Sequence, residues 1–102
     1  MFYNKLVRDK IPEIIIKDGH KCDFTYMKDS DYEEALKQKL VEEAKEFAES
    51  GNIEELADIF EVIGCILDVN GWTYDLVYQV ALDKEKERGS FYDKVFLVSV
   101  DE

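Results

Sequence analysis

Hydrophobic residues recur at helical spacing through most of the chain, and each helical stretch closes on a glycine, at positions 19, 51, 71 and 89. Glycine is common just beyond a helix end, because it adopts the left-handed backbone conformation at little cost. The pattern predicts four helices, over about residues 9–18, 30–50, 52–70 and 73–88. Pro12 falls in the opening turn of the first helix, where its missing N–H is tolerated.

Polar residues mark where three of these helices should begin. Ser30 and Asn52 each precede a glutamate by three residues, Glu33 and Glu55, which is the spacing of a capping box. Thr73 is the expected N-cap of the fourth helix. Glu55 therefore has two competing interpretations, as a cap partner or as a residue facing the interior, and its apolar neighbours favour the second.

Two segments have the composition of strands. Residues 21–28 contain Phe24, Thr25 and Tyr26, and residues 94–100 read KVFLVSV. Aromatic and β-branched residues between turn signals favour extended structure. We therefore expect a mainly α fold, a bundle of about four helices with two short β-strands that could pair as a small sheet.

The third helix, IEELADIFEVIGCILDV, is apolar around most of its circumference. A helix with this pattern is buried on more than one side. In a chain of 102 residues, the extra covering surface is expected to come from another subunit, so we predict a homodimer or a higher homo-oligomer.

The length fits one domain over residues 1–102, with a single modest core. The formal charge of −11 argues against binding to a nucleic-acid polymer or an anionic membrane, since both favour positive surfaces. No run approaches the apolar length that crosses a bilayer, and the N-terminus lacks the apolar segment of a signal peptide. We expect a cytoplasmic protein in which Cys22 and Cys65 are reduced thiols.

Carboxylates stand out by where they fall on the second helix. At about 100° per residue, the apolar stripe of this helix is defined by Leu36, Leu40 and Phe47. Glu43 projects among these residues, and Glu46 borders the same stripe. Both acidic groups are therefore expected to face the interior.

The third helix repeats the arrangement. Glu55 lies in the arc of Ile59, Val62 and Ile66, and Asp58 lies beside Val62. Residues three positions apart on a helix are neighbours, so two packed helices would bring the four carboxylates Glu43, Glu46, Glu55 and Asp58 together.

An ionised carboxylate in an apolar interface is costly unless something pairs with it. Mg²⁺ is a suitable partner, because it prefers oxygen ligands. Lys and Arg side chains could instead neutralise the four groups in a buried salt-bridge network. Glu42, Glu49 and Glu54 point to the polar sides of their helices, where a solvated charge needs no partner.

Several runs resemble one enzyme superfamily. The run EEAKE at residues 42–46, followed by EELAD at residues 54–58, resembles the all-α nucleoside triphosphate pyrophosphohydrolases, the MazG-like proteins. NKLVRDKIP at residues 4–12 and KERGSF at residues 86–91 look like the two ends of a small house-cleaning pyrophosphatase-type group within that superfamily. Ser90 departs from the pattern, which has a second glycine there.

The resemblance implies hydrolysis between the α- and β-phosphates of a nucleoside triphosphate, giving a nucleoside monophosphate and pyrophosphate. It implies Mg²⁺, with Mn²⁺ as an alternative, held by Glu43, Glu46, Glu55 and Asp58 as catalytic and metal-binding residues. The attacking group would be a metal-activated water.

Basic side chains near the two ends of the chain are the candidates for phosphate binding: Lys5, Arg8, Lys84, Lys86 and Arg88. Taken alone, these residues are better explained as solvated surface charges or, for Lys84 and Arg88, as charges that interact favourably with the helix dipole. The resemblance favours phosphate contact for Arg8 and Arg88. Two other functions stay open: a non-catalytic helical module that binds a partner or sequesters nucleotide, and a pyrophosphohydrolase of phosphoribosyl nucleotides.

Overall fold

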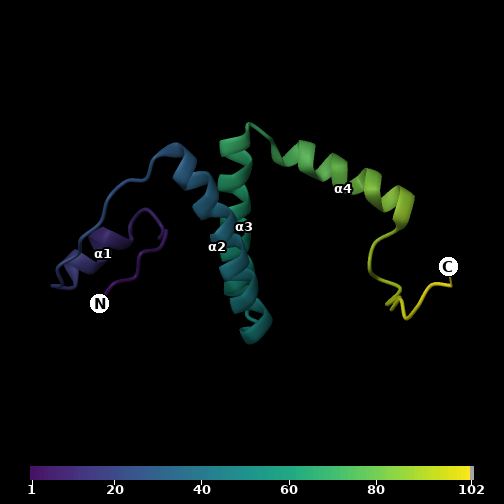
Figure 1. Ribbon diagram of the computed structural model, residues 1–102, viewed down its shortest axis with the longest axis horizontal. Helices are drawn as coiled ribbons and strands as arrows, with labels where there is room; N and C mark the ends of the chain where they lie inside the picture. Colours follow the sequence, from purple (N-terminus) through teal and green to yellow (C-terminus); the bar gives the residue numbers. More distant parts are fainter. Residues whose placement is uncertain (102) are drawn as a thin grey trace. The chain divides into compact units, whose positions relative to one another are not determined.

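A computed structural model describes residues 1–101 of the chain, and four α-helices make up its regular secondary structure over that range (Figure 1). The helices are α1 (Ile11–Lys17), α2 (Asp29–Ser50), α3 (Ile53–Asn70) and α4 (Tyr74–Arg88). The prediction of a mainly α chain with four helices is confirmed. Each predicted helix is present, and its ends fall within about two residues of the predicted ones.

Neither predicted strand is present: residues 21–28 and 94–100 contain no strand. In the first segment, Phe24 and Tyr26 contact each other edge to face, with ring centroids 6.0 Å apart. In the second, Lys94 has a φ of 60°, a left-handed conformation that is incompatible with the start of a strand. The side chains favour extended structure, but a strand also requires a paired neighbour, and these segments have none.

The chain divides into two compact units. The first is Met1–Gly71 and contains α1, α2 and α3, and the second begins at Trp72 and contains α4. The expectation of a single domain stays a prediction.

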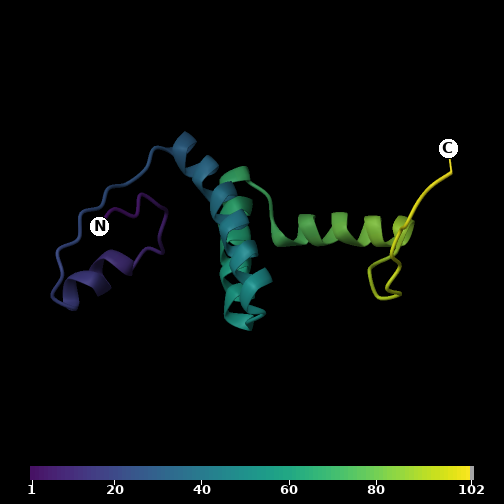
Figure 2. The same ribbon diagram turned by 60° about the horizontal axis from the view of Figure 1, so that its bottom comes forward.

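Helices α2 and α3 form the framework of the first unit and lie side by side in both views (Figures 1 and 2). Only Gly51 and Asn52 connect them, so the two helices run antiparallel as a helical hairpin. Gly51 has a φ of 67°, and its N–H donates to the carbonyl oxygen of Phe47 at 2.8 Å. Leu36 from α2 and Val62 and Leu67 from α3 are the buried hydrophobic residues of the described chain.

The helix starts agree with the sequence in part. Thr73 caps α4 as predicted, because its Oγ1 accepts a hydrogen bond from the Leu76 N–H at 3.1 Å. The capping box predicted at Ser30 is wrong, since α2 begins at Asp29 and has Lys28 as its N-cap. Asn52 is the N-cap of α3, but its backbone N–H donates to the Ser50 hydroxyl. The Glu55 carboxylate is therefore not engaged as a capping partner.

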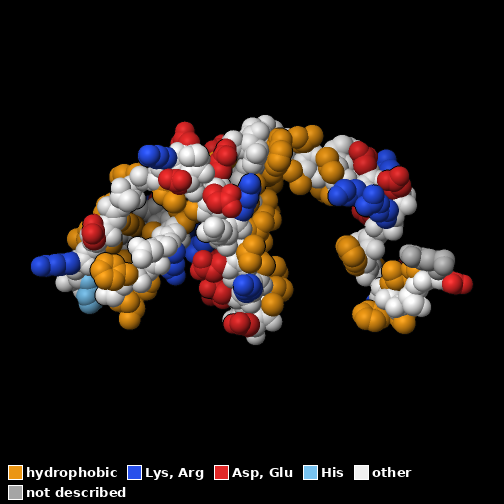
Figure 3. Space-filling model, viewed as in Figure 1, with side chains coloured by type: hydrophobic (Ala, Val, Ile, Leu, Met, Phe, Trp, Pro, Cys, Tyr) orange, Lys and Arg blue, Asp and Glu red, His pale blue; other side chains and the backbone are white. Residues whose placement is uncertain are grey.

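One face of α3 is apolar and exposed. Ile53, Leu56 and Phe60 share this face, and their exposed fractions are 79%, 47% and 63%. Figure 3 shows acidic side chains gathered on one side of the α2–α3 pair and hydrophobic side chains on the other. None of the helices in residues 1–101 is both long enough and apolar enough to cross a lipid bilayer.

Candidate metal centre

Two overlapping groups of carboxylates lie on helices α2 and α3. Glu43 from α2 and Glu55 and Asp58 from α3 each offer an oxygen, and these oxygens lie within 4.8 Å of one another. The same is true of Glu42, Glu43 and Glu46 along α2. The structure therefore brings Glu43, Glu55 and Asp58 together as predicted, and Glu46 is linked to them only through Glu43, which is common to both groups. Glu46 is exposed, so the expectation that it faces the interior is wrong. We call these five side chains the acidic cluster.

Glu43 is the buried member of this cluster. Its exposed fraction is 6%, and it is the buried charged residue of the described chain, as its place in the apolar stripe of α2 predicted. Burial raises the pKa of Glu43, and a hydrogen bond with Glu46 raises it further, whereas a hydrogen bond from Lys39 opposes the rise. The protein environment therefore disfavours the charged form of this carboxylate.

The two oxygens of Glu43 differ in their partners. Oε1 lies 3.4 Å from the Nζ of Lys39, which also lies 3.4 Å from an oxygen of Glu42. Oε2 is buried and has no hydrogen-bond partner within residues 1–101. A buried carboxylate oxygen without a donor is costly, and natural proteins rarely leave one in place without a reason.

Lys39 and Glu42 were missed in the sequence prediction. Glu42 was placed on the polar side of α2, yet it is only part-exposed and shares the cluster with Glu43 and Glu46. The available signal was the spacing from Lys39, which is three residues before Glu42 and four before Glu43. A lysine at these spacings sits over both glutamates on one helix face.

Arg8 reaches the cluster from the N-terminal segment. One guanidinium nitrogen donates to Oδ1 of Asp58 at 2.5 Å, and the other lies 3.8 Å from Oε1 of Glu61. The hydrogen bond to Asp58 raises the pKa of Arg8, so its guanidinium stays charged. Salt bridges thus engage Glu42, Glu43 and Asp58, although only Glu43 among these carboxylates is buried. Glu46 and Glu55 form no ion pair within the described chain.

The other predicted phosphate-binding residues take no part in this contact. Lys5 places its ammonium group 5.8 Å from the ring centroid of Tyr3. Lys84, Lys86 and Arg88 belong to α4, in the second unit. Within that unit a hollow of about 300 Å³ adjoins the end of α4. It is lined by Glu85, Arg88, Gly89, Ser90, Tyr92, Asp93 and Val95.

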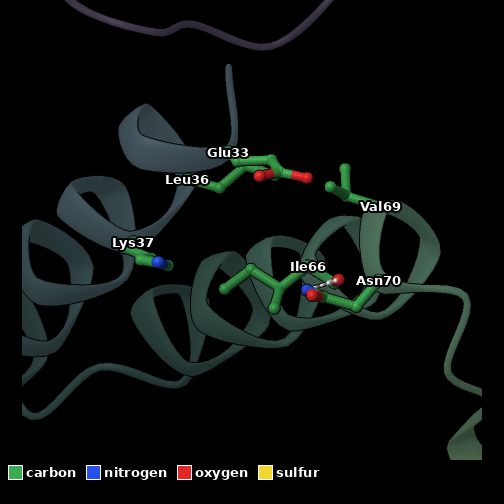
Figure 4. Close-up of a pocket in the computed structure, with 6 residues that line it drawn as sticks. All are labelled: Glu33, Leu36, Lys37, Ile66, Val69 and Asn70. Carbon is green, nitrogen blue, oxygen red and sulfur yellow. Dashed lines mark hydrogen bonds between the residues drawn. The ribbon is translucent and has the colours of Figure 1, made fainter. Parts of the chain in front are cut away.

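A second hollow lies between the far ends of α2 and α3 (Figure 4). Leu36 and Lys37 line it from α2, and Ile66 and Asn70 line it from α3, where the Asn70 amide donates to the Ile66 carbonyl oxygen at 2.8 Å. Its volume of about 50 Å³ is far below that of a typical small-molecule site. This hollow is therefore not a nucleotide pocket.

The donor set of the acidic cluster suits a divalent cation. All its donors are carboxylate oxygens, the ligand type that Mg²⁺ and Mn²⁺ prefer. Glu43, whose Oε2 lacks a partner, belongs to both groups. A cation bound next to Glu43 would receive carboxylate ligands from both α2 and α3. The residues present thus fit the ion that the sequence pattern suggested.

Comparison of the chain with protein-family models, with curated proteins and with solved structures finds no match.

Proposed function

We propose that this protein is a Mg²⁺-dependent nucleotide pyrophosphohydrolase, which cleaves between the α- and β-phosphates of a nucleoside triphosphate. The observation that carries the proposal is Glu43: a buried carboxylate with one oxygen lacking a partner, within 4.8 Å of oxygens of Glu55 and Asp58. The resemblance of residues 42–46, 54–58, 4–12 and 86–91 to MazG-like proteins supplies the reaction class.

The energetics of the cluster support a role in cation binding. Carboxylates brought this close repel one another, and burial of Glu43 adds a desolvation cost. Lys39 and Arg8 offset only part of this cost, since each pairs with one side of the cluster. A sequence selected for stability alone would place neutral residues here, so the retained charge is consistent with a ligand that requires it.

The residues divide the work by their chemistry. Glu43, Glu55 and Asp58 would hold the ion between the two helices, and Glu46 would contribute from the exposed side of α2. When bound, Mg²⁺ supplies charge neutralisation for the triphosphate and lowers the pKa of a bound water. Lys5 and Arg8, in the same unit as the cluster, are the candidates to neutralise the phosphates further, and a phosphate-binding role for Lys84, Lys86 and Arg88 stays a prediction from the sequence.

A second function is favoured by the ion pairs. Arg8 and Lys39 neutralise part of the cluster without any metal, as they would in a non-catalytic helical module that binds a partner or sequesters nucleotide. Glu43 argues against this alternative, because a scaffold gains nothing from a buried oxygen without a donor.

The test is pyrophosphate release from a panel of nucleoside triphosphates, their deoxy forms and a phosphoribosyl nucleotide, with and without Mg²⁺. We expect release from at least one compound only when Mg²⁺ is present. Glu43→Gln and Asp58→Asn should reduce release by about 100-fold or more, as expected when a group that stabilises the transition state is lost. Glu49→Gln, which removes an exposed charge from the same helix, is the matched control and should leave the rate unchanged.

Circular dichroism of each variant separates loss of activity from loss of the fold. Undiminished turnover in folded Glu43→Gln and Asp58→Asn would remove both residues from the mechanism. Nucleotide binding without pyrophosphate release, in all compounds of the panel, would favour the sequestering module.

A further inference from the structure

Arg8 forms a hydrogen bond with a carboxylate that would also bind the cation. Its guanidinium donates to Asp58, one of the carboxylates that would hold the ion, and approaches Glu61 one turn further along α3. The contact joins residues 50 positions apart and brings the segment before α1 onto the face of α3. Arg8 is 55% exposed and the Asp58 side chain 35% exposed, so solvent reaches the pair.

The guanidinium and a divalent ion would compete for the Asp58 carboxylate. A carboxylate that accepts a hydrogen bond from arginine must release or reorient that partner before it coordinates a metal in the same direction. An exposed ion pair is weak, so such a release is thermally accessible. Two positive groups at one carboxylate also repel each other, which strengthens the competition.

We propose that Arg8 is a built-in counter-ion of the acidic cluster, displaced from Asp58 when a divalent cation binds and thereby freed to meet an anionic phosphate. This inference rests on the proposed function, because it takes the cluster as the cation site. It adds an order of events: cation first, then release of the N-terminal segment, then contact of Arg8 with the anionic substrate. Arg8 is thus a substrate-binding residue whose partner changes between the metal-free and the loaded protein.

The inference predicts that removing Arg8 tightens metal binding. Mg²⁺ alone is titrated by calorimetry into the full chain at low ionic strength, where exposed ion pairs are least screened. We expect Arg8→Gln to lower the apparent Kd for Mg²⁺ by about twofold to fivefold, the affinity equivalent of an exposed ion pair. Lys10→Gln is the matched control: it also removes one positive charge from the N-terminal segment, but Lys10 is exposed and takes part in none of the ion pairs of the described chain.

A second measurement follows the arginine itself. In the nuclear magnetic resonance spectrum of the wild-type protein, the Nε–Hε signal of Arg8 should move on Mg²⁺ saturation toward its position in metal-free Asp58→Asn. The signal is assigned by its loss in Arg8→Gln. Arg8→Gln should also bind Mg²⁺ more tightly while releasing pyrophosphate more slowly at saturating metal, since the freed guanidinium is missing.

Each outcome decides between the two proposals. Equal changes in Mg²⁺ affinity in Arg8→Gln and Lys10→Gln would mean that only net charge matters and would overturn the displacement of Arg8. Weaker Mg²⁺ binding in Arg8→Gln, or an Arg8 signal unmoved at saturation, would overturn it as well, while Mg²⁺-dependent pyrophosphate release would keep the proposed function intact. No detectable Mg²⁺ binding in any variant would overturn both.

Discussion

At the scale of single residues, Glu43 is the charged side chain that the described fold buries. It is buried between two helices, its pKa is raised chiefly by desolvation, and its Oε2 lacks a partner. In the metal-free protein these features make its charge a local source of instability. The carboxylate is therefore suited to a partner that is present only part of the time.

Glu43→Gln should stabilise the metal-free protein at neutral pH. The amide keeps the shape of the side chain and removes the buried charge. We expect a gain of about 1 kcal/mol, which raises the thermal midpoint of a chain of this size by about 4–8 °C. Glu49→Gln, an exposed change on the same helix, should leave the midpoint unchanged.

The pH dependence of this gain has a definite sign. Because the pKa of Glu43 is raised in the folded state, the folded protein binds more protons than the unfolded chain between the two pKa values. Its contribution to stability is therefore full below the unfolded pKa and is lost as pH rises through the folded one. The difference in unfolding free energy between Glu43→Gln and the wild type should shrink as the pH is lowered from neutral toward 4.5, the ordinary value for a glutamate. A difference independent of pH would show that the Glu43 charge is not its source.

The sequence predicted the carboxylates of the candidate site but not their counter-ions. Helical spacing placed Glu43 and Glu55 on apolar arcs, and the structure brings them together with Asp58. Spacing could not predict the Arg8 contact, because Arg8 precedes α1 and reaches Asp58 only through the path of the folded chain. Local periodicity reports which face a residue occupies, whereas long-range partners depend on tertiary structure.

At the scale of elements, the α2–α3 hairpin holds the acidic cluster, and its tight connection fixes how the two helices meet. Gly51 takes the left-handed conformation, and Asn52 starts α3 directly after it. The glycine positions predicted this turn and the C-terminal ends of the other helices, because a single residue that adopts a positive φ is enough to end a helix. The prediction of two strands failed for the opposite reason: a strand needs a paired neighbour, and the sequence of one segment does not show whether such a neighbour is present.

Gly51→Ala tests the turn. A Cβ at this position would meet no atom within 4 Å, so the cost comes only from the left-handed backbone. We expect a loss of about 1–2 kcal/mol in unfolding free energy, measured by urea denaturation. Gly51→Asn should lose less, because asparagine tolerates this conformation better. Equal losses in the two variants would assign the cost to something other than φ.

At the scale of the whole molecule, exposed apolar surface is the main feature left without an explanation inside one chain. Ile53, Leu56 and Phe60 share a face of α3, and Leu76 and Val80 are about half exposed on α4. Patches of this kind mark interaction surfaces in stable proteins. The predicted homo-oligomer would bury this apolar surface, because a second copy of the chain presents the same apolar face of α3.

Leu56→Lys tests this association. A charge in the middle of the α3 face should prevent burial against a second copy, so the variant should sediment as a monomer at concentrations where the wild type is a dimer or larger. Analytical ultracentrifugation across a dilution series measures the change. Glu54→Gln alters an exposed position two residues away and should behave as the wild type does. A wild type that remains monomeric throughout the series would contradict the predicted homo-oligomer.

The donor-free oxygen at position 43 also has a consequence for directed evolution of this protein. A library screened only for survival of heating should repeatedly yield neutral side chains at that position, because they relieve the burden of the enclosed anion. A library screened for cation-dependent turnover should discard the same variants. Recovery of neutral residues at position 43 in the first screen and of glutamate in the second would show that this position lowers thermal stability and is required for activity.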